Sequence, residues 1–194
     1  MAPKSALGTE PRERILTVAL ACFEAQGIKA TSMDDVAGAL GVSRPALYYY
    51  FANKDQLLLE VVARQAEAVL GAARRRLRAR GPERIAQAAY LGYVESLANP
   101  YVRMLIEGEI AQATPVLLEN ERILQIQRSF WMPLLEEARA EGHLRGDRPL
   151  EEVMEWIIFL QFSLAAAGAG FGLDEATVRD RIYTYVLPGL SAQG

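Results

Sequence analysis

The sequence predicts an all-α fold, in which a small N-terminal group of three helices precedes a larger helical region. Apolar residues recur with helical i, i+3, i+4 spacing, and the alternation typical of strands is nearly absent. The 194 residues are 51% hydrophobic, enough for a second and larger core. Glycines and prolines separate the helical stretches. We therefore divide the chain into a flexible arm at 1–10, a three-helix domain at 11–54, a connecting helix at 55–80 and a helical domain at 81–194.

The first predicted helix begins at Pro11 and ends at Gly27. Proline suits a first helical turn, because an N–H there would have no partner within the helix. The buried face of this helix comprises Ile15, Ala19, Cys22 and Phe23. Because Cys22 is the only cysteine, an internal disulfide is excluded, and we interpret Cys22 as a packing residue.

The second predicted helix is short and amphipathic. Its apolar stripe consists of Met33, Val36, Ala37 and Leu40. Ser32 precedes the helix as an N-cap, and Asp35 resembles the reciprocal half of a capping box. Gly41 ends the helix, and a short turn that contains glycine lets the next helix cross it steeply.

The third predicted helix starts after Ser43, with Pro45 in its first turn. Leu47 and Phe51 lie four residues apart and share its buried face. Between them, the consecutive tyrosines 48–50 step around the axis by about 100° each. At least one or two of these tyrosines must therefore face solvent.

Two short helices joined by a glycine turn form a helix-turn-helix, which sets its second helix against DNA. Exposed tyrosine hydroxyls suit phosphate oxygens and base edges. Arg44, in the first turn of the second helix, is able to donate two hydrogen bonds to guanine, and Lys54 suits a phosphate. The alternative is that the tyrosines are ordinary core and rim residues.

Three motifs recur here at fixed spacing: RILTVALACFEAQG, then T-S-x-x-x-V-A, then G-V-S-x-x-x-L-Y-x-Y-F-x-x-K. With them, residues 12–59 resemble the N-terminal DNA-binding domain of the TetR family of transcriptional repressors. The resemblance implies DNA contacts from Ser32, Ser43, Arg44, Pro45, Tyr48, Tyr49, Tyr50 and Lys54. Tyr50 stands where many members have histidine, and Asp34 stands where a basic residue is frequent. Since an acid that faces phosphates weakens binding, we assign no DNA contact to Asp34, and acceptance of a hydrogen bond from a cytosine amine is the alternative.

Charge is unevenly divided along the chain. Residues 1–80 carry 12 Lys and Arg against 8 Asp and Glu, whereas residues 81–194 carry 9 against 16. A positive N-terminal part on an acidic body presents DNA with one preferred end. The arginine-rich stretch at 74–80 lies at a helix C-terminus, where cations complement the helix dipole, so we interpret it as a solvated face and not as a DNA contact.

Beyond Gly81 the sequence predicts five helices, at residues 82–98, 101–111, 116–141, 150–167 and 174–186. The breaks between them fall at Asn-Pro, Thr-Pro and glycine-rich segments. Pro133 lies inside the third of these helices. We expect it either to kink that helix or to end it near Trp131.

The stretch 156–173 has no charged residue and approaches the length needed to span a bilayer. Gln161, Ser163 and the closing glycines shorten its apolar core, so we predict a buried helix and no membrane span. Its small alanines allow another helix to approach closely. The TetR resemblance implies a homodimer formed through the last two helices, at about 150–187.

The central helices carry many aromatic residues, which suit a cavity between helices as well as ordinary packing. Only the resemblance implies that some of them bind a small-molecule effector. The candidates are Tyr93, Met104, Gln127, Trp131, Phe159 and Phe162.

The leading prediction is a repressor that binds a palindromic operator as a dimer and is released by a small-molecule effector. A ligand-independent DNA-binding activator or an architectural protein is the alternative. An enzyme is a remote possibility, because the chain has one His and one Cys and neither H-E-x-x-H nor G-x-S-x-G. We expect no cofactor and no metal. The lone cysteine and the absence of an apolar run in the first ten residues favour the cytoplasm.

Overall fold

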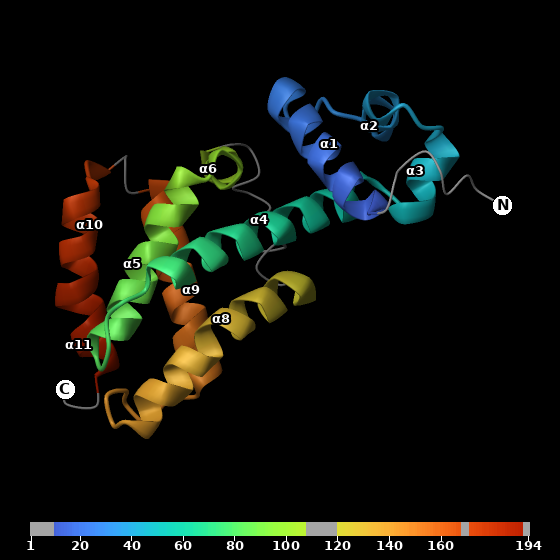
Figure 1. The fold of residues 1–194 in the computed structure, drawn as a ribbon. Helices are drawn as coiled ribbons and strands as arrows, with labels where there is room; N and C mark the ends of the chain where they lie inside the picture. The colour runs from blue at the N-terminus through green and yellow to red at the C-terminus, as the bar shows by residue number, and fades with distance from the viewer. Residues whose placement is uncertain (1–9, 108–119, 168–170, 192–194) are drawn as a thin grey trace. The chain divides into compact units, whose positions relative to one another are not determined.

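The computed structural model describes residues 10–107, 120–167 and 171–191 (Figure 1). These residues are largely helical, as predicted, and their one β-type pairing is an isolated bridge between Leu144 and Ser191. The chain folds into two compact units, residues 1–64 and 65–194, each with its own core. Apart from Glu10, the arm predicted at 1–10 lies outside the described residues.

The first unit contains α1 (Pro11–Gln26), α2 (Met33–Leu40), α3 (Arg44–Tyr50) and the first part of α4 (Lys54–Arg76). The three short helices are those that the sequence predicts. After α2 the chain turns at Gly41, whose φ of +71° is one that side-chain-bearing residues rarely adopt. All four helices contribute to the core, which includes Ile15, Leu16, Phe23, Val36, Leu40, Leu47, Phe51, Leu57 and Val61.

The predicted capping box at the start of α2 is confirmed. The N–H of Asp35 donates to Oγ of Ser32 (3.2 Å), and the N–H of Ser32 donates to Oδ2 of Asp35 (2.7 Å). The Ser32 hydroxyl also donates to Oδ2 of Asp35 (2.6 Å), and this bond, together with the one from the Ser32 N–H, lowers the pKa of the Asp35 carboxyl. Ser43 occupies the predicted N-cap position of α3, but its hydroxyl makes no capping hydrogen bond.

The second unit contains the rest of α4 and the remaining helices. They are α5 (Glu83–Ala98), α6 (Pro100–Glu107), α8 (Glu121–Ala140), α9 (Leu150–Ala167), α10 (Glu175–Arg181), η3 (Ile182–Val186) and α11 (Leu187–Leu190). Helix α9 packs against α5, α6 and α8, while α10 and η3 pack against α5. Across the described ranges, no helix combines the length and apolar character that a membrane span requires.

A glycine allows α5 and α9 to approach closely. Nε2 of Gln161 on α9 donates to the carbonyl of Ala89 on α5 (2.7 Å). A Cβ atom at Gly92 would lie 2.1 Å from that Nε2. Gln161, one of the polar residues that shorten the apolar stretch of this helix, therefore crosslinks two helices of this unit.

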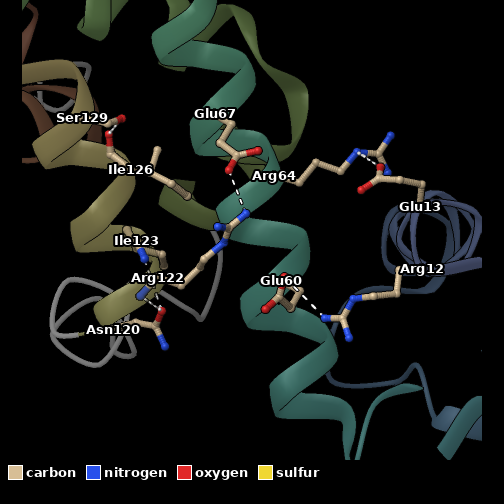
Figure 2. A network of polar contacts seen from close by, with 10 residues as sticks. All are labelled: Arg12, Glu13, Glu60, Arg64, Glu67, Asn120, Arg122, Ile123, Ile126 and Ser129. Atoms are coloured by element: carbon tan, nitrogen blue, oxygen red, sulfur yellow. Dashed lines mark hydrogen bonds and ion pairs between the residues drawn. The ribbon is translucent and has the colours of Figure 1, made fainter. Parts of the chain in front are cut away.

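Two predicted boundaries need correction. Helix α8 begins at Glu121 and not at 116, because Oδ1 of Asn120 caps it by accepting the N–H groups of Arg122 and Ile123 (Figure 2). Residues 116–119 lie outside the described residues. The helix predicted at 174–186 changes to a π-helical turn at Ile182. This wider turn adjoins Pro188, which has no N–H to continue an α-helical ladder.

Helix α8 continues through Pro133 to Ala140, so the expected end near Trp131 is wrong. A proline cannot donate to the carbonyl four residues earlier, which here belongs to Ser129. Arg74 of α4 supplies the missing donor, since its Nη2 donates to that carbonyl at 2.9 Å. The Arg74 guanidinium also lies 5.5 Å from the centroid of the Phe130 ring. One member of the arginine-rich stretch thus supports the helix that the proline interrupts.

This arrangement predicts a coupling between Arg74 and Pro133. The Arg74→Met substitution should lower the free energy of unfolding by about 0.5–1 kcal/mol, because the Ser129 carbonyl exchanges its protein donor for water. In a Pro133→Ala background the restored N–H satisfies that carbonyl, so the same substitution should cost less. Urea denaturation of the four chains measures the coupling, with Arg75→Met as the matched control. Equal losses in both backgrounds would contradict it.

Candidate DNA-binding surface

Helix α3 has one buried face and one exposed face. Leu47 and the following Phe51 are fully buried. On the exposed face Tyr49 is 75% accessible and Tyr48 37%, and Tyr50 is half-buried with its ring edge against Tyr49 at a centroid distance of 5.2 Å. Aromatic rings therefore line the solvent side of α3.

Contacts within the first unit hold the end of α3 in place. The Arg12 guanidinium lies 4.6 Å from the centroid of the Phe51 ring, and its Nη1 donates to the carbonyl of Tyr50 (3.4 Å). The same side chain pairs with Glu60 of α4 at 3.7 Å (Figure 2). Arg12 thus joins α1, α3 and α4 at one point.

Arg44, the first residue of α3, is held by two neighbours. Its Nη1 donates to Oδ2 of Asp34 (3.2 Å), and its Nε lies 3.1 Å from Oδ1 of the same carboxylate. Its Nη2 donates to the hydroxyl of Tyr48 (3.3 Å), whose ring centroid is 5.3 Å from the guanidinium carbon. The hydrogen bond to Tyr48 and the charge of Asp34 raise the pKa of Arg44 further, so it remains a cation. Asp34, which the sequence left without a role, is the partner of Arg44.

Lys54, the first residue of α4, contacts the connection between α1 and α2. Its Nζ donates to the carbonyls of Ile28 (2.9 Å), Thr31 (3.0 Å) and Lys29 (3.2 Å), all in the connection between α1 and α2. The buried Thr31 hydroxyl donates to the carbonyl of Gly27 (2.8 Å). The ammonium group therefore ties the start of α4 to the segment that leads into α2, an arrangement that local sequence patterns do not reveal.

The other predicted DNA contacts lie in the same unit. The hydroxyl of Ser32 is occupied by the capping box, whereas Ser43 and Pro45 are exposed at the start of α3. The unit thus brings all eight predicted contact residues onto the start of α2, α3 and the start of α4. By contrast, Arg74 and Arg76 of the arginine-rich stretch bind Ser129 and Glu95 in the second unit.

The six effector candidates fall into different environments. Tyr93 and Trp131 are buried, Gln127 and Phe162 are half-buried, and the side chain of Met104 lies outside the described residues. Phe159 is 55% exposed and stacks on Trp156 at a centroid distance of 5.7 Å. Nε1 of Trp131 and Oε1 of Gln127 are buried without a hydrogen-bond partner. These two atoms belong to residues one turn apart on α8.

The described residues hold no group of His, Cys, Asp and Glu side chains that could bind a metal ion.

The sequence of this chain is similar to those of bacterial transcriptional regulators. Residues 15–61 match the family model for bacterial regulatory proteins of the tetR family. The transcriptional repressor KstR2 of Mycolicibacterium smegmatis is 25% identical over 150 residues, which cover 75% of this chain and 73% of KstR2. The transcriptional regulator AcrR of Shigella flexneri is 44% identical over 52 residues, 27% of this chain and 24% of AcrR.

The fold is also shared with solved structures. The regulator FadR from Bacillus subtilis, crystallised with stearoyl-CoA, has a TM-score of 0.66 at 14% identity, over 91% of this chain and 97% of FadR. At that identity the likeness concerns the fold.

The Lys54 geometry predicts that charge alone does not replace this residue. Both Lys54→Met and Lys54→Arg should lower the free energy of unfolding, by about 2 kcal/mol for Met, because a planar guanidinium fits three converging carbonyls poorly. Urea denaturation monitored by circular dichroism tests this, and wild-type stability in the Arg variant would contradict it. The phosphate contact expected from the sequence gives a separate signal, because Arg would then preserve the salt dependence of DNA binding and Met would reduce its slope by about one per protomer.

Proposed function

Because this chain is a DNA-binding transcriptional regulator of the TetR family, we propose that it acts in the cytoplasm as an effector-released repressor. In this proposal two copies bind a near-palindromic operator, and a small molecule that binds the second unit releases them. The exposed face of α3, with Arg44 held at its first turn, is the observation that carries the proposal.

The first turn of a recognition helix is the part that approaches base edges in the major groove. Arg44 stands there with one N–H of Nη1 and one of Nη2 engaged, which leaves each nitrogen a second N–H for a base. Tyr49 extends furthest into solvent and suits a phosphate or a thymine methyl. The exposed Ser43 and Pro45 are suited to contacts at the same groove edge.

Exposed aromatic residues on the second unit support a homodimer. Trp156 and Phe159 of α9 are each more than half exposed, and Tyr185 of η3 is 71% exposed. Trp156 and Tyr185 line a groove of about 450 Å³ together with Leu160 and Val186. Clusters of exposed aromatic rings on a protein surface mark interaction sites. In our proposal the same patch on two copies meets about a two-fold axis, and Phe159 belongs to this interface and not to the effector site.

The effector proposal rests on the unpaired atoms of α8. Trp131 Nε1 is a donor and Gln127 Oε1 is an acceptor, and leaving such groups unpaired in a protein interior costs about 1–3 kcal/mol each. A hydroxyl group both accepts and donates, so one hydroxyl on an otherwise apolar molecule is able to satisfy both atoms. Tyr93, Phe162 and Met104 are the remaining candidates for the apolar part of this site. FadR, a fold neighbour, was crystallised in complex with stearoyl-CoA, which supports testing ligands that carry a long apolar chain.

The DNA proposal predicts selective effects of two substitutions in α3. Arg44→Ala and Tyr48→Ala should each weaken binding to a duplex that the wild-type chain selects from a random pool, by about tenfold or more for Arg44. Light scattering should show the same oligomer as the wild type, because neither residue lies in the second unit. Arg80→Ala, which removes an exposed arginine from that unit, is the matched control. Unchanged DNA affinity in both α3 variants would contradict the proposal.

The effector proposal predicts a response centred on α8. In a Trp156→Phe background Trp131 is the only tryptophan, so its fluorescence reports ligand binding next to its ring. We expect stearoyl-CoA or a steroid with a free hydroxyl to change that fluorescence, and to release the operator from the chain that keeps Trp156. Gln127→Leu should retain operator binding and lose the release. Release at unchanged ligand concentrations in that variant, or release without a change in Trp131 fluorescence, would contradict this site.

A further inference from the structure

We propose that Asp34 is a specificity-determining residue, which positions the Arg44 guanidinium toward base edges and keeps it from the nearest phosphate. The inference rests on the proposed DNA-binding function. The negative charge of Asp34 opposes binding to DNA phosphates. We therefore explain the residue by selectivity between base pairs and not by affinity for DNA.

The contacts place Asp34 behind Arg44 on the neighbouring helix. Asp34 is the second residue of α2, and Arg44 is the first residue of α3, across the Gly41 turn. Two guanidinium nitrogens lie within 3.2 Å of the carboxylate oxygens, and the third donates to Tyr48. A guanidinium contacted through all three of its nitrogens has a defined orientation before DNA arrives. Preorganisation of this kind reduces the entropy that is lost on binding.

The exposure of the pair indicates that it does not serve stability. The side chains of Arg44 and Asp34 are 62% and 59% exposed, and ion pairs with that access to water contribute little to folding. Asp34 is also not needed to cap α2, because Ser32 and Asp35 already form the capping box. Its charge also favours the positive end of the α2 dipole, as any acid in the first turn would, but its one specific side-chain partner among the described contacts is Arg44.

Charge gives Asp34 a second effect on DNA binding. Sequence-independent affinity comes from cations that neutralise phosphates. A carboxylate within 3.2 Å of Arg44 offsets part of its charge, so Arg44 adds less to that affinity than an unpaired arginine would. The free N–H groups of Nη1 and Nη2 are still able to donate to guanine O6 and N7. The pair therefore lowers the affinity for DNA of any sequence and keeps the discrimination between base pairs.

Removing only the charge tests this assignment. Asp34→Asn keeps the side-chain shape and one acceptor oxygen, while Glu24→Gln removes one exposed negative charge from α1 of the same unit as the matched control. The full-length wild type, Asp34→Asn, Arg44→Ala and the double variant are compared with Glu24→Gln. The probes are a duplex that the wild type selects from a random pool, copies of it with each G·C pair replaced in turn, and a random duplex. Fluorescence anisotropy at several salt concentrations gives the affinities.

We expect one G·C pair whose replacement costs the wild type about tenfold and Arg44→Ala nothing. At that pair Asp34→Asn should lose most of the discrimination, while its affinity for the random duplex rises severalfold and its salt dependence steepens by about one per protomer. The double variant should discriminate no better than Arg44→Ala. Glu24→Gln should keep the wild-type discrimination.

Other results would overturn the assignment in distinguishable ways. If Asp34→Asn discriminates between base pairs as the wild type does, or loses affinity equally at every base pair, Asp34 does not position Arg44. If no base pair depends on Arg44, the assignment fails while DNA binding by the chain stands. If the wild type enriches no sequence, the proposed function fails together with it.

Discussion

A helix of seven residues is not stable by itself in water, so α3 depends on the contacts behind it. Leu47 and Phe51 anchor it in the core of the first unit, and Arg12 covers the Phe51 ring. Lys54 fixes the segment before α2 through three carbonyls. The exposed face of α3 therefore depends on contacts made behind it, and Arg44 at its first turn is held by the carboxylate of Asp34.

Helix α8 of the second unit has polar groups that its own backbone does not pair, and they fall into two kinds. In the second unit Arg74 supplies the donor that Pro133 cannot give to Ser129, so the interrupted helix keeps its hydrogen bonding. On the same helix Ile123 and Trp131 are buried on either side of Gln127. Oε1 of Gln127 and Nε1 of Trp131 are nevertheless buried without a hydrogen-bond partner. The carbonyl of Ser129 thus has a donor from another helix, whereas the side-chain atoms of Gln127 and Trp131 have no such partner. Their isolation is the reason for assigning them to a ligand.

Local patterns predict most of the first unit, because its signals lie within a few residues of one another. The capping box at Ser32, the turn at Gly41 and the buried pair Leu47 and Phe51 are of this kind. The partners of Lys54 lie more than twenty residues away in sequence, and Asp34 meets Arg44 across the turn, so neither contact has a local signal. The course of α8 through its proline likewise depends on a different helix. Sequence patterns therefore predict the exposed face of α3, whereas the partners of Arg44 and Lys54 are visible only in the tertiary structure.

The central claim is that two copies of this chain present α3 to DNA at a fixed spacing. Selection of duplexes from a random pool by the full-length wild-type chain tests it most directly. The account predicts enrichment of an inverted repeat whose half-sites are centred about one helical turn, or a small multiple of it, apart. A G·C pair should recur at equivalent positions of both half-sites, as two copies of Arg44 require. Enrichment of a single asymmetric site, or of no sequence, would contradict the account.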